Sequence, residues 1–90
     1  MFGMYGGKEE RVRLECENSF AGVIIDRFGK DVTLNRLDDT HFFVNVEAAV
    51  SRQFLSWVIG LGEGVKIAGP ESVVARMKDE IRRLMRQYQK

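Results

Sequence analysis

The sequence predicts an α+β fold in which a four-stranded antiparallel sheet carries its helices on one face. Segments 11–17 and 41–50 alternate apolar and polar residues as half-buried strands do, and 65–68 alternates over a shorter length. Apolar residues spaced three to four apart separate these segments, which is typical of amphipathic helices. With a weaker strand at 32–37, the order is βαββαβ followed by one more helix. This order predicts a ferredoxin-like sandwich with an additional C-terminal helix.

Length and composition limit what the chain can be. Ninety residues make one domain with a single core, and 44% hydrophobic with 30% charged residues is ordinary for a globular chain. A net charge of +1 offers no bulk attraction to nucleic acid or anionic lipid. One cysteine, without a CxxC motif or a histidine cluster, excludes a disulfide scaffold and a structural zinc site. The sequence has no leader and no membrane-length apolar run, so we expect a cytoplasmic protein. We also expect no metal and no cofactor.

The beginning of the chain predicts a linker followed by a strand. Residues 1–10, MFGMYGGKEE, contain three glycines and no periodicity, so we expect a linker there and a domain at 11–90. A chain that starts on such a segment suggests a piece cut from something longer. The strand at 11–17 turns Val12, Leu14 and Cys16 inward. Its outward residues are Arg11, Arg13, Glu15 and Glu17.

The next segments predict a helix and a hairpin. Asn18 is expected to cap a helix that ends at Gly29, and Gly22 suggests that this helix approaches the sheet closely. The strand at 32–37 suits a sheet edge, and 38–40 turns the chain into the strand at 41–50. That strand turns Phe42, Val44, Val46 and Ala48 inward, and Phe43, Asn45 and Glu47 outward.

The stretch 51–70 predicts a helix, a glycine-rich corner and a strand. Ser51 is a good N-cap for a helix that ends near Leu61. Gly60, Gly62 and Gly64 are expected to supply positive φ where the chain reverses. Pro70 suits the first turn of a last helix that runs to about Gln89, with one apolar face. The apolar face consists of Val73, Val74, Met77, Ile81, Leu84, Met85 and Tyr88. On the other face, Asp79 and Glu80 are both spaced to pair with Arg83.

The outer face of the sheet is the candidate site. Its residues combine positive donors, an aromatic surface, an amide and a carboxylate on adjacent central strands: Arg11, Arg13, Phe43, Asn45 and Glu47. Such a set could hold an anionic effector or seat a neighbouring domain. The alternative is that Arg13 and Glu47 pair across the strands while Phe43 packs under the linker.

Other candidate residues favour structural roles. His41 with Asp38 and Asp39 is interpreted as a polar hairpin turn, because no further metal ligand is in sight. Cys16 is interpreted as a buried thiol. Trp57 fits partial core packing better than a ligand platform. Arg82, Arg83 and Arg86 could grip phosphates, but Asp79, Glu80 and Gln87 alternate with them, which favours a solvated helix face. The glycines of the corner follow a helix instead of a strand, which excludes a dinucleotide-binding loop.

Most of the chain resembles a known family, the WCX domain that follows the WYL domain in bacterial helix-turn-helix transcription regulators. The matching segments are FGMYGGKEERVRLECENSFAGVIIDRFGKDV, THFFVNVEAAVSRQFLSWVIGLGEGVKIAGPESV and a terminal amphipathic helix ending in RQY. The middle segment is the most specific, because generic ferredoxin-like packing does not demand its glycine-rich corner followed by Val-x-Ile and Pro-Glu-Ser.

The resemblance implies a non-catalytic regulatory domain that serves effector response, dimer assembly or both. It implies upstream WYL and helix-turn-helix domains as partners, a homodimer, and a small-molecule or nucleotide effector. DNA would be contacted only through the missing N-terminal domain, and no membrane partner is implied. The alternative is a free-standing ACT-like domain that binds a small ligand, which shares the βαββαβ order. An acylphosphatase-like enzyme would need an arginine-bearing phosphate loop after the first strand, whereas Glu17-Asn18-Ser19 has none.

Overall fold

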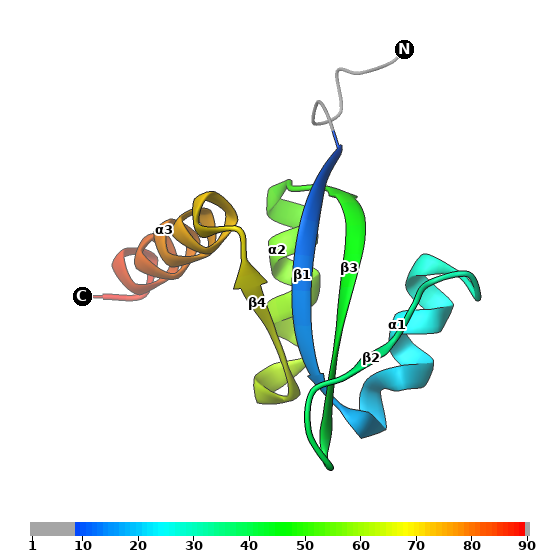
Figure 1. Ribbon diagram of the computed structural model, residues 1–90. Coiled ribbons are helices and arrows are strands. Elements are labelled where there is room, and N and C mark those ends of the chain that lie inside the picture. The colour runs from blue at the N-terminus through cyan, green and yellow to red at the C-terminus, as the bar shows by residue number, and fades with distance from the viewer. Residues whose placement is uncertain (1–8, 90) are drawn as a thin grey trace.

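The computed structural model describes residues 9–89 and contains a four-stranded antiparallel sheet with three α-helices (Figure 1). The sheet order is β2-β3-β1-β4, and each neighbouring pair is antiparallel. This confirms the predicted α+β fold and is compatible with a ferredoxin-like arrangement. The strands are β1 (Glu9–Glu17), β2 (Asn35–Arg36), β3 (His41–Ala49) and β4 (Val65–Gly69). The helices are α1 (Ala21–Phe28), α2 (Arg52–Gly60) and α3 (Glu71–Gln87).

The core lies between the sheet and the first two helices. β1 and β3 pair along their whole length, so that Val12 lies opposite Val46 and Leu14 opposite Val44. These inward residues are buried together with Ile24 of α1 and with three residues of α2, as the alternation predicts. The α2 residues are Phe54, Leu55 and Val58. Phe28 of α1 meets Trp57 of α2 edge to face, with ring centroids 5.7 Å apart, which joins the two helices on this side of the sheet.

Two strands differ in length from the prediction. β1 begins at Glu9, so it includes two residues of the predicted linker, and the rest of that linker lies outside the described residues. The strand expected at 32–37 is reduced to Asn35–Arg36. Val32 and Leu34 still pack against the core, but they do so from an irregular segment. Burial of apolar side chains therefore does not require a longer strand at this edge.

The start of α1 also differs from the prediction. Asn18 opens a 3-10 turn (Asn18–Phe20) instead of capping the helix. Its side-chain amide donates to the carbonyl of Asp39 at 3.0 Å, and its backbone N–H donates to the carbonyl of Thr40 at 2.9 Å. Asn18 thus ties the end of β1 to the hairpin between β2 and β3. A Cβ atom at Gly22 would meet no heavy atom within 4 Å, so the close approach expected there is absent.

The prediction that three glycines supply positive φ in the corner between α2 and β4 is wrong for two of them. Gly62 has a φ of +78°, whereas Gly60 belongs to α2 and Gly64 ends a 3-10 turn (Gly62–Gly64) without positive φ. Gly64 is required for a different reason, because a Cβ atom there would overlap Cε1 of the Phe20 ring. At the other end of α2, the hydroxyl of Ser51 accepts a hydrogen bond from the N–H of Phe54 at 3.2 Å, which confirms the predicted N-cap.

The third helix leaves the sheet beside β4 (Figure 1). It begins at Glu71, one residue after Pro70, which occupies the position before the first turn. Val73 is buried in the core, and Val74 and Met77 are partly buried against it. Among the described residues, no helix has the length and apolar character needed to cross a bilayer.

Candidate functional site

The five predicted site residues all lie on the outer face of the sheet, on the neighbouring strands β1 and β3. The antiparallel register places Arg11 opposite Glu47, Arg13 opposite Asn45, and Glu15 opposite Phe43. Because side chains alternate between the two faces of a strand, these residues share the face turned away from α1 and α2. The structure therefore brings together the set that the sequence predicts.

Arg13 is the centre of the contacts on this face. Its guanidinium carbon lies 3.8 Å from the ring centroid of Phe43, which is a cation–π contact. The same guanidinium lies 3.5 Å from the carboxylate of Glu15, and the ammonium of Lys66 on β4 lies 3.9 Å from the other oxygen of that carboxylate. The predicted alternative of an Arg13–Glu47 pair is wrong, because among the described residues Arg13 pairs with Glu15, and Glu47 lies opposite Arg11. The Phe43 ring is contacted by Arg13, and its predicted packing under the linker falls mostly on residues 1–8, which lie outside the described part of the chain.

The charges on the outer face suit docking of another protein surface better than binding of a small anion. Arg11, Arg13 and Lys66 alternate with Glu15 and Glu47 on three adjacent strands, so positive charge does not accumulate. Such a pattern gives a partner a specific arrangement of donors and acceptors around one aromatic ring.

A second feature, which sequence reasoning missed, is an apolar groove where α2, β4 and α3 meet. The groove has a volume of about 370 Å³. Its apolar lining residues are Val58, Ile59, Val65, Ile67, Val74, Met77, Ile81 and Leu84. The apolar stripe of α3 continues from the groove into solvent. The exposed fraction rises along it, from 48% for Ile81 at the groove to 60% for Met85 and 78% for Tyr88. The periodicity of 70–89 predicted an apolar face but could not show that its second half has no sheet beneath it.

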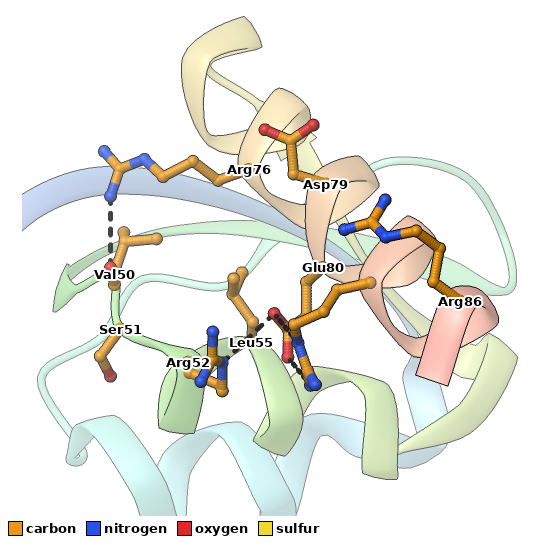
Figure 2. A pocket seen from close by; sticks show the side chains of 9 residues that line it. Val50, Ser51, Arg52, Leu55, Arg76, Asp79, Glu80 and Arg86 are labelled. Carbon is orange, nitrogen blue, oxygen red and sulfur yellow. Dashed lines mark hydrogen bonds and ion pairs between the residues drawn. The ribbon is translucent and has the colours of Figure 1, made fainter. Parts of the chain in front are cut away.

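A third feature is a cleft of about 390 Å³ between the start of α2 and the outer side of α3 (Figure 2). Its charged lining consists of Arg52, Arg76, Asp79, Glu80, Arg83 and Arg86. Val50, Ser51 and Leu55 complete the lining. The sequence predicted a solvated helix face at Arg82, Arg83 and Arg86. It could not predict a cleft there, because Arg52 reaches α3 from another helix.

Glu80 organises this cleft from a buried position, with only 7% of its surface exposed. Arg83 binds it with two nitrogens, Nε to Oε1 at 3.1 Å and Nη2 to Oε2 at 2.7 Å. Arg52 adds a contact from Nε to Oε1 at 3.4 Å. The hydrogen bonds from Arg83 hold the pKa of Glu80 below its ordinary value, against the opposing effect of burial. The predicted Glu80–Arg83 pair is confirmed, whereas Asp79 pairs with Arg82 at 2.8 Å instead of with Arg83.

The two arginines at the ends of the cleft have different surroundings. Arg76 donates to the carbonyl of Val50 at 3.2 Å and forms an ion pair with Glu10 of β1. Arg86 reaches back along α3 towards Asp79 (Figure 2) and, within residues 9–89, takes part in no ion pair.

The polar turn predicted at 38–40 is confirmed. The carboxylate of Asp38 accepts hydrogen bonds from the N–H of Thr40 at 2.8 Å and from its hydroxyl at 3.1 Å. The backbone N–H of Thr40, followed by the Thr40 hydroxyl and His41, lowers the pKa of Asp38. Across residues 9–89, no three His, Cys, Asp or Glu side chains gather in a way that could hold a metal ion.

Cys16 is fully buried, as the alternation of β1 predicts. Burial, with a smaller effect of the neighbouring Glu15 charge, raises the pKa of its thiol to about 11. Because the thiolate is the reactive form, this environment suits a packing role and not a nucleophile.

Comparison with protein families identifies the family of this chain. The family model described as the WCX domain matches residues 8–85, which is most of the chain. No curated protein matches the sequence.

Proposed function

Because the chain belongs to the WCX domain family, we propose that it is a non-catalytic regulatory domain of a bacterial WYL-type transcription regulator. In this proposal it serves assembly and effector response in the cytoplasm, and an upstream helix-turn-helix domain reads the DNA. Family membership supports the association with WYL regulators. The observation that carries the assembly role is the exposed apolar stripe of α3.

The occupant that we propose for this stripe is a second copy of the chain. The exposed residues Ile81, Met85 and Tyr88 follow one another at helical spacing, and contiguous exposed apolar surface of this kind marks an interaction site. A stripe along one helix can pack against the same stripe of an antiparallel copy, which gives the two-fold symmetry that is commonest among dimers. The net charge of +1 causes little repulsion between two copies.

The outer sheet face is proposed as the seat of the neighbouring WYL domain. The balanced charges around Phe43 support this assignment, because they can specify a partner by matching donors and acceptors without attracting anions in general. The proposal gives the two surfaces different partners, so their variants should have separable effects.

The assembly role is tested by the oligomeric state of Met85→Glu. Light scattering coupled to size exclusion should show a wild-type dimer and a Met85→Glu monomer, with the dissociation constant raised about tenfold or more, because a carboxylate would be buried in an apolar interface. Ala75→Glu is the matched control, since it adds the same charge to an exposed position of α3. A wild-type chain that is monomeric at all concentrations, or equal effects of the two variants, would contradict the proposal.

The docking role is tested with Arg13→Glu and Phe43→Ala in the complete regulator. Both should weaken the contact between this domain and the upstream domains, seen as increased amide exchange of β1 and β3, and leave the dimer intact. If neither variant increases the exchange of β1 and β3, the outer face is not the docking surface.

A further inference from the structure

We propose that the cleft between α2 and α3 binds the phosphate group of a small anionic ligand, held chiefly by Arg52, Arg83 and Arg86. This inference deepens the effector-response part of the proposed function and depends on it only for the biological role of the ligand. Binding itself can be tested on the 90-residue chain.

The first step of the argument is charge. Four arginines line the cleft, against the two carboxylates of Asp79 and Glu80. The Asp79 carboxylate is paired with Arg82, which does not line the cleft. Glu80 is shared between Arg83 and Arg52, so one buried carboxylate holds two guanidinium groups. Arg76 is likewise paired with Glu10, which does not line the cleft. What remains is Arg52, Arg83 and Arg86 against Glu80, so the lining carries an excess of positive charge.

The second step is the orientation of the donors. Arg83 is fixed by its paired hydrogen bonds to Glu80 and by a hydrogen bond from Nη1 to the side-chain oxygen of Gln87 at 2.7 Å. Arg52 contacts Glu80 through Nε, and its terminal nitrogens make no hydrogen bond to any described residue. The terminal nitrogens of Arg52, and the one N–H that Nη1 and Nη2 of Arg83 each keep, are therefore left to donate to phosphate oxygens. Less side-chain entropy is lost on binding when the donors are already positioned.

The third step is the size and floor of the cleft. Its volume of about 390 Å³ is at the small end of the range for ligand sites. Leu55 is buried at its base, and α2 begins beside it at the Ser51 cap, so the positive end of this helix dipole adds to the field of the arginines. Among residues 9–89, the lining includes no aromatic side chain on which a nucleobase could stack. These properties favour recognition of phosphate over recognition of a whole nucleotide.

The test is a titration with inorganic pyrophosphate, followed by amide chemical shifts at a fixed ionic strength. We expect saturable shifts at Ser51, Arg52 and Glu80. Arg86→Gln should weaken binding about tenfold, because Arg86 is the lining cation without a partner among the described residues. Lys78→Gln is the matched control: it removes the same charge from an exposed position of the same helix outside the cleft and breaks no ion pair among the described residues, so it should change the affinity less than twofold. Adenosine diphosphate should bind no more tightly than pyrophosphate.

Several results would overturn the inference. Equal losses for Lys78→Gln and Arg86→Gln would mean that net charge alone attracts pyrophosphate. Adenosine diphosphate binding ten times more tightly would contradict recognition of phosphate alone. Binding of a polyglutamate peptide without any pyrophosphate shift would show that the cleft docks an acidic chain. A chain that dimerises normally but binds no pyrophosphate would refute this site and leave the proposed assembly role standing.

Discussion

At the scale of single residues, glycines in and beside the corner between α2 and β4 have different tasks. Gly62 provides the positive φ that reverses the chain. Gly64 leaves room for the ring of Phe20, which arrives from the 3-10 turn after β1. Gly60 has neither role, because it belongs to α2 and a Cβ atom there would meet no heavy atom within 4 Å.

Substitution to alanine should separate these roles. Gly64→Ala is expected to lower the free energy of unfolding by about 1–3 kcal/mol, because the added methyl group overlaps the Phe20 ring. Gly60→Ala is the control and should raise stability by about 0.5–1 kcal/mol, since alanine is the better helix former. Urea unfolding followed by circular dichroism measures both changes. A neutral Gly64→Ala would mean that Phe20 moves aside without cost.

The sequence patterns predict which way a side chain faces better than they predict which residue it contacts. Alternation along β1 and β3 fixes which side chains face the core, because successive residues of a strand point to opposite faces. It does not fix the contact of Arg13 with Phe43, which depends on the register between two strands about thirty residues apart in the sequence. The role of Asn18 was wrongly predicted for the same reason, since its partners Asp39 and Thr40 are distant in the sequence.

At the scale of the elements, the N-cap of α2 is a local sequence signal whose contribution to stability can be measured. Ser51→Ala should lower the free energy of unfolding by about 1 kcal/mol, because the N–H of Phe54 loses its side-chain acceptor. Ser56→Ala is the matched control: Ser56 is exposed within the same helix, and alanine has the higher helix propensity, so stability should not fall. Thermal melts of both variants measure the difference. Equal destabilisation by the two substitutions would contradict the capping role.

The elements that were least predictable are those at the edges of the fold. The length of β2 depends on how much of β3 it can pair with, and Val32 and Leu34 reach the core without strand geometry. The periodicity of α3 is present in the sequence, but its burial depends on the extent of the sheet. The groove and the cleft could therefore not be predicted, because each is lined from more than one element.

At the scale of the whole molecule, two carboxylates connect stability to pH. The folded pKa values of Asp38 and Glu80 are lowered from their ordinary values of 3.8 and 4.5. A lowered folded pKa contributes stability that is present above the unfolded pKa and is lost as the pH falls through the folded pKa. The melting temperature should therefore depend little on these groups above about pH 5 and should decrease below about pH 4.5.

Glu80→Gln should make this acid dependence shallower, because the variant has no charge at this position to lose. It should also melt at a lower temperature near neutral pH, since Arg83 and Arg52 lose their charged partner. Asp31→Asn, at an exposed position, serves as the control and should leave the acid slope unchanged. Parallel acid slopes for wild type and Glu80→Gln would show that Glu80 does not contribute to the transition.

The central position of β1 in the sheet has a consequence for synthesis. β1 leaves the ribosome first among the strands, yet its two neighbours, β3 and β4, are separated from it by intervening helices and a hairpin. A nascent chain that ends before Val65 exposes one unpaired edge of β1, with its backbone amides available to other polypeptides. Completion of this sheet during translation must therefore wait for the synthesis of β4, and a stalled product that ends before it would be a ready target for chaperones and proteases.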